Sequence, residues 1–372
     1  MNKIKISNRQ FTIFLSGFMF GSAPLLIASS PAELAGPDAW LSVVFAAAAG
    51  LLVIWVNSYL GGRHPDKTFV EIIQLLLGKW VGSVISVCFI FFSLVIATQV
   101  VWYIGDFFTA VYVPEMSSYQ INILFVIVLA VALLYGLEAM FRATEIFFIL
   151  TFPLYIIAML MLTPKIKPDN LLPMLENGII PVVKGSVPLM GFTVLPLIYL
   201  NMVFPVNMGN LKEAKKSMLK GYFLGIITVF IGIIMCILVL GSNLTANLRY
   251  PLFTLTREIN IGTIFTRLEP LIVFVWLVTG FIAAYLYLYA AVVGLSQLFK
   301  LKEHKKIILP LLLLVTVYSG SIYKNVPYEI SWDSYVWPPS IFTFGFILPV
   351  VLLITSLIKN RRAKHRAPKV RV

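Results

Sequence analysis

Apolar segments of about 20 residues recur from one end of this chain to the other, and no polar module separates them. A helix needs about 20 apolar residues to cross the hydrocarbon core of a bilayer. Of the residues, 59% are hydrophobic and 12% are charged, whereas about a quarter of the residues of a soluble domain are charged. We therefore expect an all-α integral membrane protein with a single transmembrane domain over residues 1–372.

Charged residues, prolines and glycines divide the apolar sequence into about ten transmembrane helices. Two intervening stretches, 68–78 and 251–264, have apolar residues at helical spacing but are too short to cross a bilayer. They are either helices that lie at the membrane interface or ordinary connecting helices. The expected spans are 10–28, 39–60, 81–110, 118–137, 143–162, 185–204, 218–241, 269–297, 307–323 and 340–358.

The distribution of Lys and Arg predicts the orientation of these spans, because cytoplasmic loops retain positive charge. If residues 1–9 are cytoplasmic, the inner segments and the tail hold 22 of the 29 Lys and Arg residues. Both termini are then cytoplasmic, which requires an even number of spans. The basic tail at 359–372 either anchors this topology or binds anionic lipid or a partner.

The sequence contains no signature of a disulfide, a metal site or an enzyme. Cys88 and Cys236 each lie inside a long apolar run, which favours packing or lipid-facing roles. His64, His304 and His365 are far apart, and none has a second ligand at metal-binding spacing. No phosphate-binding glycine loop or nucleophile elbow is present. The net charge of +13 follows loops between spans, so it indicates membrane topology and not nucleic-acid binding. We expect no cofactor and no enzymatic activity.

Two spans contain helix-breaking residues near their centres. The first has Gly17 and the run GSAP at 21–24, and the sixth has Pro188, Gly191 and Pro196. These are the first helices of each half of a five-plus-five arrangement, and they run in opposite directions. Paired breaks predict inverted repeats with a ligand site at the membrane midplane, where freed backbone N–H groups face an anionic group. Alternatively, glycine and proline here only allow close helix packing.

Small residues at similar depth in the third and eighth spans leave room for a small ligand at this site. Trp102 and Tyr103 lie one turn outward and either gate the cavity or belong to an interfacial aromatic belt, as do Tyr285, Tyr287 and Tyr289. The candidate ligand-binding residues are Gly21, Ser22, Ala23, Ala97, Thr98, Met190, Gly191, Phe192, Thr193, Ala283 and Ala284.

Few charges lie within the spans, and this bears on mechanism. Asp106, Glu145 and Glu269 lie toward helix ends, and no carboxylate pair forms an obvious proton relay. The sequence therefore gives no visible sign of strong proton coupling.

Several segments, in their order and spacing, resemble the B subunits of spore-germination nutrient receptors. They are ISNRQ at 6–10, GRHP at 62–65 followed by Thr68, Glu71 and GKW at 78–80, LPMLENG at 172–178, and YP at 250–251 followed by RLE at 267–269 and Trp276. The resemblance covers nearly the whole chain and places it in the spore permease family of the amino acid/polyamine/organocation superfamily.

The resemblance implies ten helices in a leucine-transporter-like inverted repeat. It also implies a nutrient-sensing subunit with A-type and C-type partner subunits in the inner membrane of a bacterial spore. Carried over by position, residues 21–23 and 190–193 would contact the ligand. Relatives often have an acidic residue in the second stretch, where this chain has Thr193.

Two functions follow from these observations. The first is a receptor subunit that binds a small nutrient, expected to be an amino acid, and transmits a conformational change to its partners. The second is an ion-coupled amino acid permease. The scarcity of carboxylates at mid-membrane depth favours the receptor. A lipid-modifying membrane enzyme would need a catalytic constellation that the sequence lacks.

Overall fold

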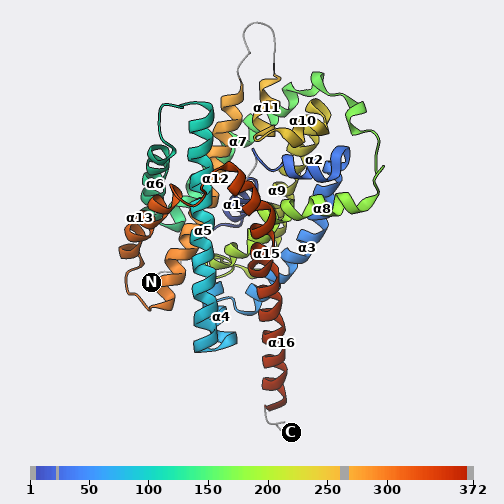
Figure 1. Ribbon diagram of the computed structural model, residues 1–372. Helices are drawn as coiled ribbons and strands as arrows, with labels where there is room; N and C mark the ends of the chain where they lie inside the picture. The colour runs from blue at the N-terminus through green and yellow to red at the C-terminus, as the bar shows by residue number, and fades with distance from the viewer. Residues whose placement is uncertain (1–5, 22–24, 260–267, 367–372) are drawn as a thin grey trace.

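The structure is a computed structural model that describes residues 6–21, 25–259 and 268–366. The described residues form a bundle of helices joined by turns and by longer connections such as 162–178 between Met161 and Ile179 (Figure 1). Eight helical segments among them are long and apolar enough to cross a membrane. The described helices of the first and ninth expected spans, α1 and α13, are shorter at 14 and 12 residues. The expected all-α membrane architecture is confirmed.

The helices follow the expected order. The first five spans contain α1 (Asn8–Gly21), α3 (Ala39–Arg63), α5 (Lys79–Val111), α6 (Ser118–Tyr135) and α7 (Leu137–Met161), and the short helix α2 (Ser29–Ala35) leads directly into α3. The second five are α8 (Ile179–Leu189) with η4 (Met190–Val194) and η5 (Leu195–Met202), α9 (Leu211–Leu240), α12 (Glu269–Leu298), α13 (Ile308–Ser319), and α14 (Val326–Ser331) continued through α15 (Trp337–Phe342) to α16 (Leu348–Arg366). The connecting helices are α4 (Phe69–Leu77), α10 (Ser242–Asn247) and α11 (Pro251–Arg257).

Local sequence signals explain where these helices begin. Thr68 caps α4 in a capping box, because its hydroxyl accepts from the backbone N–H of Glu71 while the Glu71 carboxylate accepts from the N–H of Thr68. Gly136 separates α6 from α7 with φ of 88°, a conformation that a side chain would strain. The expected short helix at 68–78 is confirmed as α4. Of the expected helix at 251–264, the described part forms α11, and residues 260–264 lie outside the described residues.

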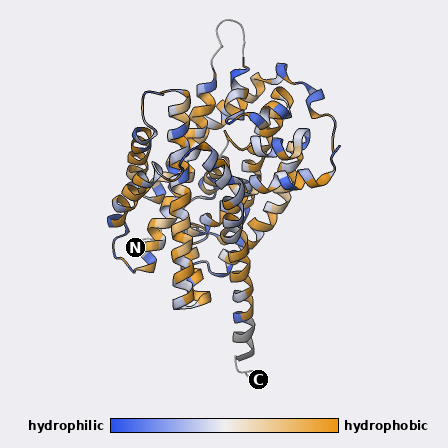
Figure 2. Ribbon diagram, in the orientation of Figure 1, coloured by the Kyte–Doolittle hydropathy of each residue, from blue (hydrophilic) through white to orange (hydrophobic). Residues whose placement is uncertain are grey.

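The apolar residues on the outer face of the bundle match a lipid environment. Trp55, Leu124 and Ile146 are between 57% and 68% exposed although they lie well inside long helices. Figure 2 shows hydrophobic residues along the lengths of the helices and more hydrophilic residues at the two ends of the bundle. Such a surface is stable in hydrocarbon and would be costly in water.

The two ends of the bundle carry different elements. The helix α4 and the end of α16 lie at one end, and α2, α10 and α11 lie at the other (Figure 1). This arrangement agrees with the predicted topology, in which the α4 region and the basic tail share one side of the membrane.

The last span departs from the sequence-based boundaries. It was expected over 340–358, but the helix begins at Val326 and continues to Arg366 through two π-helical turns, η7 (Trp332–Val336) and η8 (Thr343–Ile347). The expectation was wrong because Glu329 and Asp333 resembled an outer loop. Both have polar partners from other parts of the chain, so a helix that carries them can enter the bundle.

Candidate functional site

The end of α1 lies directly against the backbone of α12. A Cβ atom placed on Gly21 would be 1.9 Å from the carbonyl oxygen of Thr279, so only glycine allows this approach. The hydroxyl of Thr279 donates to the carbonyl oxygens of Val275 and Trp276 in its own helix. The predicted contacts Ser22 and Ala23 follow Gly21 but lie outside the described residues.

The sixth span is broken in the region that the sequence predicted. The α-helix α8 ends at Leu189, a π-helical turn covers 190–194, and a 3₁₀ helix follows over 195–202. The hydroxyl of Thr193 donates to the carbonyl oxygen of Leu189 at 2.6 Å. Pro196 has no N–H to donate, which explains the change of helix type. Changes of helix type of this kind concentrate at functional sites.

A chain of buried aromatic rings joins the two broken spans. The ring of Phe18 in α1 lies 5.4 Å from that of Tyr287 in α12, which lies 5.1 Å from Tyr199 in η5. The ring of Tyr199 stacks on Phe89 of α5 at 4.6 Å. All four side chains are at most 1% exposed. Such contacts stabilise a fixed arrangement of α1, α5, α12 and η5.

The small residues predicted from the third and eighth spans lie at one level above this aromatic chain. The hydroxyl of Ser93 in α5 donates to the carbonyl oxygen of Tyr287 in α12 at 2.7 Å. The predicted topology makes these two helices antiparallel, so Ala97 and Ala283 are each one turn further toward the outer side. Ala97 and Ala283 are fully buried, and Thr98 and Ala284 are at most 1% exposed. The hydroxyl of Thr98 donates to the carbonyl oxygen of Leu94.

Trp337 of α15 is a candidate that sequence reasoning missed. Its ring stacks on Phe192 at 5.5 Å and on Phe92 of α5 at 5.8 Å. A Cβ atom placed on Gly191 would lie 3.0 Å from its Nε1. Trp337 is 3% exposed, and its indole N–H has no hydrogen-bond partner among the described residues. A buried unpaired donor costs about 1–3 kcal/mol, so it indicates a position where a partner can be supplied.

The side chain of Phe192, and the face that Gly191 leaves open, are therefore directed toward α15. Met190 of the same π-helical turn is partly buried, and Thr193 is 1% exposed. The turn as a whole contacts α1, α3 and α15. The structure thus brings the sixth-span break next to both the first and the last spans.

A small cavity lies beside α1, one turn inward from its break. Its volume is about 30 Å³, enough for one or two water molecules. Its walls come from α1, α7, α9 and α12 and include Ser16, Gly17, Thr151, Tyr155, Thr228 and Thr279. This cavity shows that the packing around the break is not complete.

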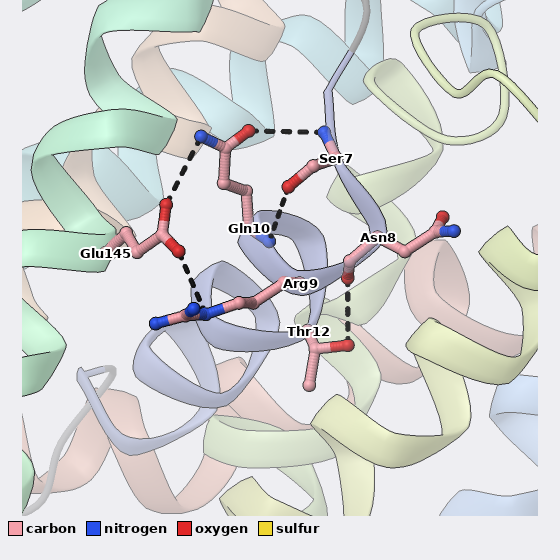
Figure 3. Close-up of polar contacts among 6 residues, drawn as sticks. All are labelled: Ser7, Asn8, Arg9, Gln10, Thr12 and Glu145. Atoms are coloured by element: carbon pink, nitrogen blue, oxygen red, sulfur yellow. Dashed lines mark hydrogen bonds and ion pairs between the residues drawn. The ribbon is translucent and has the colours of Figure 1, made fainter.

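The start of α1 is held to α7 by a carboxylate. Glu145 accepts from Nε of Arg9 at 2.9 Å and from the side-chain amide of Gln10 at 3.4 Å, as Figure 3 shows. Gln10 in turn accepts from the N–H of Ser7, whose hydroxyl accepts from the N–H of Gln10. These reciprocal bonds start the helix as a capping box. The N–H of Ile6 also donates to the carbonyl oxygen of Asn207. These contacts join residues 6–10 to α7 and to the segment after η5.

Asp106 and Glu145, which the sequence places toward helix ends, both form ion pairs across the bundle. Asp106 pairs with Arg249 at 2.7 Å and Glu145 with Arg9. Neither pair could be predicted from local sequence, because the partners are more than 130 residues apart.

The comparisons with known proteins agree with this description. Residues 5–328 match the family model described as spore germination protein. The chain belongs to this family. It is 27% identical to spore germination protein KB of Bacillus subtilis (strain 168) over 366 residues, which cover 97% of each chain. It is 28% identical to spore germination protein YndE of the same organism over 368 residues, covering 97% of this chain and 98% of that one.

Among solved structures, the chain is similar to Mhp1, a nucleobase-cation-symport-1 family transporter in a closed conformation with bromovinylhydantoin bound. The TM-score is 0.67 at 11% identity, covering 96% of this chain and 90% of that one. The similarity confirms the expected leucine-transporter-like fold.

Proposed function

We propose that this chain is the nutrient-sensing subunit of a germination receptor and binds a small molecule, most simply an amino acid, at the midplane. The observation that carries the proposal is the meeting of the two broken spans. The end of α1 lies against α12 at Gly21, and the π-helical turn at 190–194 lies beside the unpaired indole N–H of Trp337.

The polar groups at these breaks suit the two ends of an amino acid. The indole N–H of Trp337 and backbone N–H groups freed by the breaks can donate to a carboxylate. The hydroxyls of Thr98 and Thr193 donate their only protons to carbonyl oxygens of their own helices. Their oxygens therefore remain only as acceptors, which suits an ammonium group. The small side chains of Ala97, Ala283 and Ala284 would leave space for a short aliphatic part.

The last span offers a route by which binding could reach partner subunits. Trp337 and Gly345 both contact the broken sixth span, since a Cβ atom on Gly345 would be 2.4 Å from the carbonyl oxygen of Leu195. The same helix extends to Arg366 and so includes the first part of the basic tail at 359–372. We propose that ligand binding shifts this helix and that A-type and C-type subunits detect the shift in the inner spore membrane, with both termini cytoplasmic.

The alternative is an ion-coupled amino acid permease, and the fold shared with the transporter Mhp1 favours it. Uptake of labelled amino acids by proteoliposomes that contain only this chain separates the two. The receptor proposal predicts binding without accumulation, and robust accumulation driven by an ion gradient would contradict a purely sensory role.

The site is tested by binding of a panel of amino acids to the purified chain in nanodiscs. Gly191→Leu should abolish binding, because its side chain would occupy the space beside Trp337. Gly209→Leu is the matched control, since nothing lies within 4 Å of a Cβ atom there. Equal binding by both variants, at equal protein levels, would contradict the midplane site.

A further inference from the structure

A partly buried polar cluster joins three separate parts of the chain on the outer side of the candidate site. We call it the outer network, and it consists of Tyr103 and Asp106 of α5, Arg249 and Tyr250 before α11, Tyr323 before α14, Glu329 of α14 and Asp333 of η7. The neighbouring Gln99 of α5 donates to the hydroxyl of Tyr323 at 2.6 Å.

Arg249 is the single cation of this network and serves two carboxylates. Its Nη2 lies 2.7 Å from Oδ2 of Asp106 and 3.7 Å from Oε2 of Glu329. Its guanidinium also lies over the rings of Trp102 and Tyr250, at 5.8 and 5.5 Å from their centroids. The side chain of Glu329 is only 5% exposed. Arg249 therefore ties α5 to α14 in a partly buried environment, since its side chain is 28% exposed and that of Asp106 is 20% exposed.

Asp333 has no cation among its contacts in the outer network. It accepts from the hydroxyl of Tyr103 at 2.5 Å. Glu329 lies four residues before it on the same continuous helix, so the two carboxyl groups lie on one face of that helix. Two carboxyl groups can share a hydrogen bond only when one of them holds a proton. The network contains three carboxyl groups and one guanidinium, so without that proton it would hold two uncompensated negative charges.

The position of the outer network links it to the candidate site. On α5, Gln99 directly follows Thr98 and donates to Tyr323 of the network, and Tyr103 lies one turn further along the same helix. On the last span, Asp333 precedes Trp337 by one turn. A movement that separates Asp333 from α5 must therefore also move Trp337 relative to the π-helical turn at 190–194.

We propose that the outer network is a proton-operated latch, in which a proton shared by Glu329 and Asp333 keeps the last span against α5 and closes the outer side of the site. Loss of the proton leaves two adjacent carboxylates that repel each other, so the last span moves away from α5. Arg249 holds the latch closed while the proton is bound.

The test measures access from the outer side to a cysteine just below the latch. The full chain carries Thr98→Cys in a background in which Cys88 and Cys236 are replaced by Ser and Ala. The rate of labelling by a membrane-impermeant thiosulfonate is measured in right-side-out vesicles between about pH 5 and 9, a range that covers the raised pKa values of buried carboxyl groups. Each rate is divided by that of Ser321→Cys, an exposed position, which corrects for thiol ionisation.

The latch predicts that the corrected labelling rate rises about tenfold or more between the lowest and the highest pH. A tenfold change corresponds to a difference of one pKa unit between the closed and the open states. Asp333→Asn and Glu329→Gln each replace one carboxyl group of the pair by a neutral amide. Two adjacent carboxylates can then no longer form, so labelling should stay slow at every pH. Arg249→Gln should make it fast at every pH. Glu138→Gln, which alters a surface ion pair with Arg142, is the control that should behave as the parent chain.

Three results would overturn the latch. One is a corrected rate that does not change with pH in the parent chain. Another is a pH dependence that survives in both Asp333→Asn and Glu329→Gln. The third is slow labelling in Arg249→Gln. Arg249→Lys preserves the charge and serves if Arg249→Gln does not fold, and its labelling should lie between that of the parent chain and fast labelling.

Discussion

Replacing Gly21 by alanine tests the packing that brings the first break to α12. A Cβ atom at this position would be 1.9 Å from the carbonyl oxygen of Thr279 and 2.2 Å from its carbonyl carbon. Ordinary contacts of a Cβ atom begin near 3.4 Å, so α1 and α12 must separate by up to about 1.5 Å. Both sides of the contact are backbone, which cannot change rotamer to relieve it.

Overpacking of a buried contact costs about 1–3 kcal/mol, and the rigid neighbour places Gly21→Ala toward the upper end of that range. We expect a lower melting temperature in nanodiscs and at least about tenfold weaker ligand binding, because residues that follow Gly21 are proposed ligand contacts. The matched control is Gly209→Ala, where no atom lies within 4 Å. The reasoning would be refuted if Gly21→Ala melted and bound ligand as Gly209→Ala does.

Three further predictions concern other contacts. Trp337→Phe keeps the stacking on Phe192 but removes the unpaired N–H. The ligand-free variant should therefore melt at a temperature at least as high as the parent chain, while calorimetry should show about tenfold weaker ligand binding. A marked loss of ligand-free stability would contradict this prediction. Burial, together with Arg63 and Lys67, lowers the pKa of His64 below its ordinary value of 6.5. The neutral form is therefore favoured in the folded chain, and stability should fall as the pH drops below about 6.5; His64→Gln should flatten that fall in a melting series. Glu145→Gln should lower the free energy of unfolding by at most about 1 kcal/mol, because the side chain of Arg9 is 70% exposed. It should nevertheless increase proteolysis of the residues before α1. Unchanged proteolysis would show that the ion pair does not hold this segment.

The sequence predicts the membrane spans well because span length and charge are local properties. The glycine and prolines at 188–196 likewise mark the break of the sixth span correctly, since they act on the backbone at their own positions. In the first span α1 ends at Gly21, and residues 22–24 of the predicted break lie outside the described residues. The fold of the whole bundle could be inferred only through the resemblance to a known family.

Polar side chains whose partners are distant in sequence could not be predicted in the same way. Glu329 and Asp333 resemble loop residues until Tyr103 and Arg249 are placed beside them. The sequence did not reveal that Glu329 and Asp333 form a carboxyl pair on one continuous helix, four residues apart. Trp337 resembles an interfacial tryptophan in sequence, and only its position beside Gly191 shows that its N–H lacks a partner.

The most direct test of the account is calorimetric titration of the purified chain in nanodiscs with a panel of amino acids, in parallel with Gly191→Leu and Gly209→Leu. The account predicts saturable binding of at least one amino acid to the parent chain and to Gly209→Leu, and none to Gly191→Leu. Absence of binding to a folded parent chain across the panel, or undiminished binding by Gly191→Leu, would contradict it.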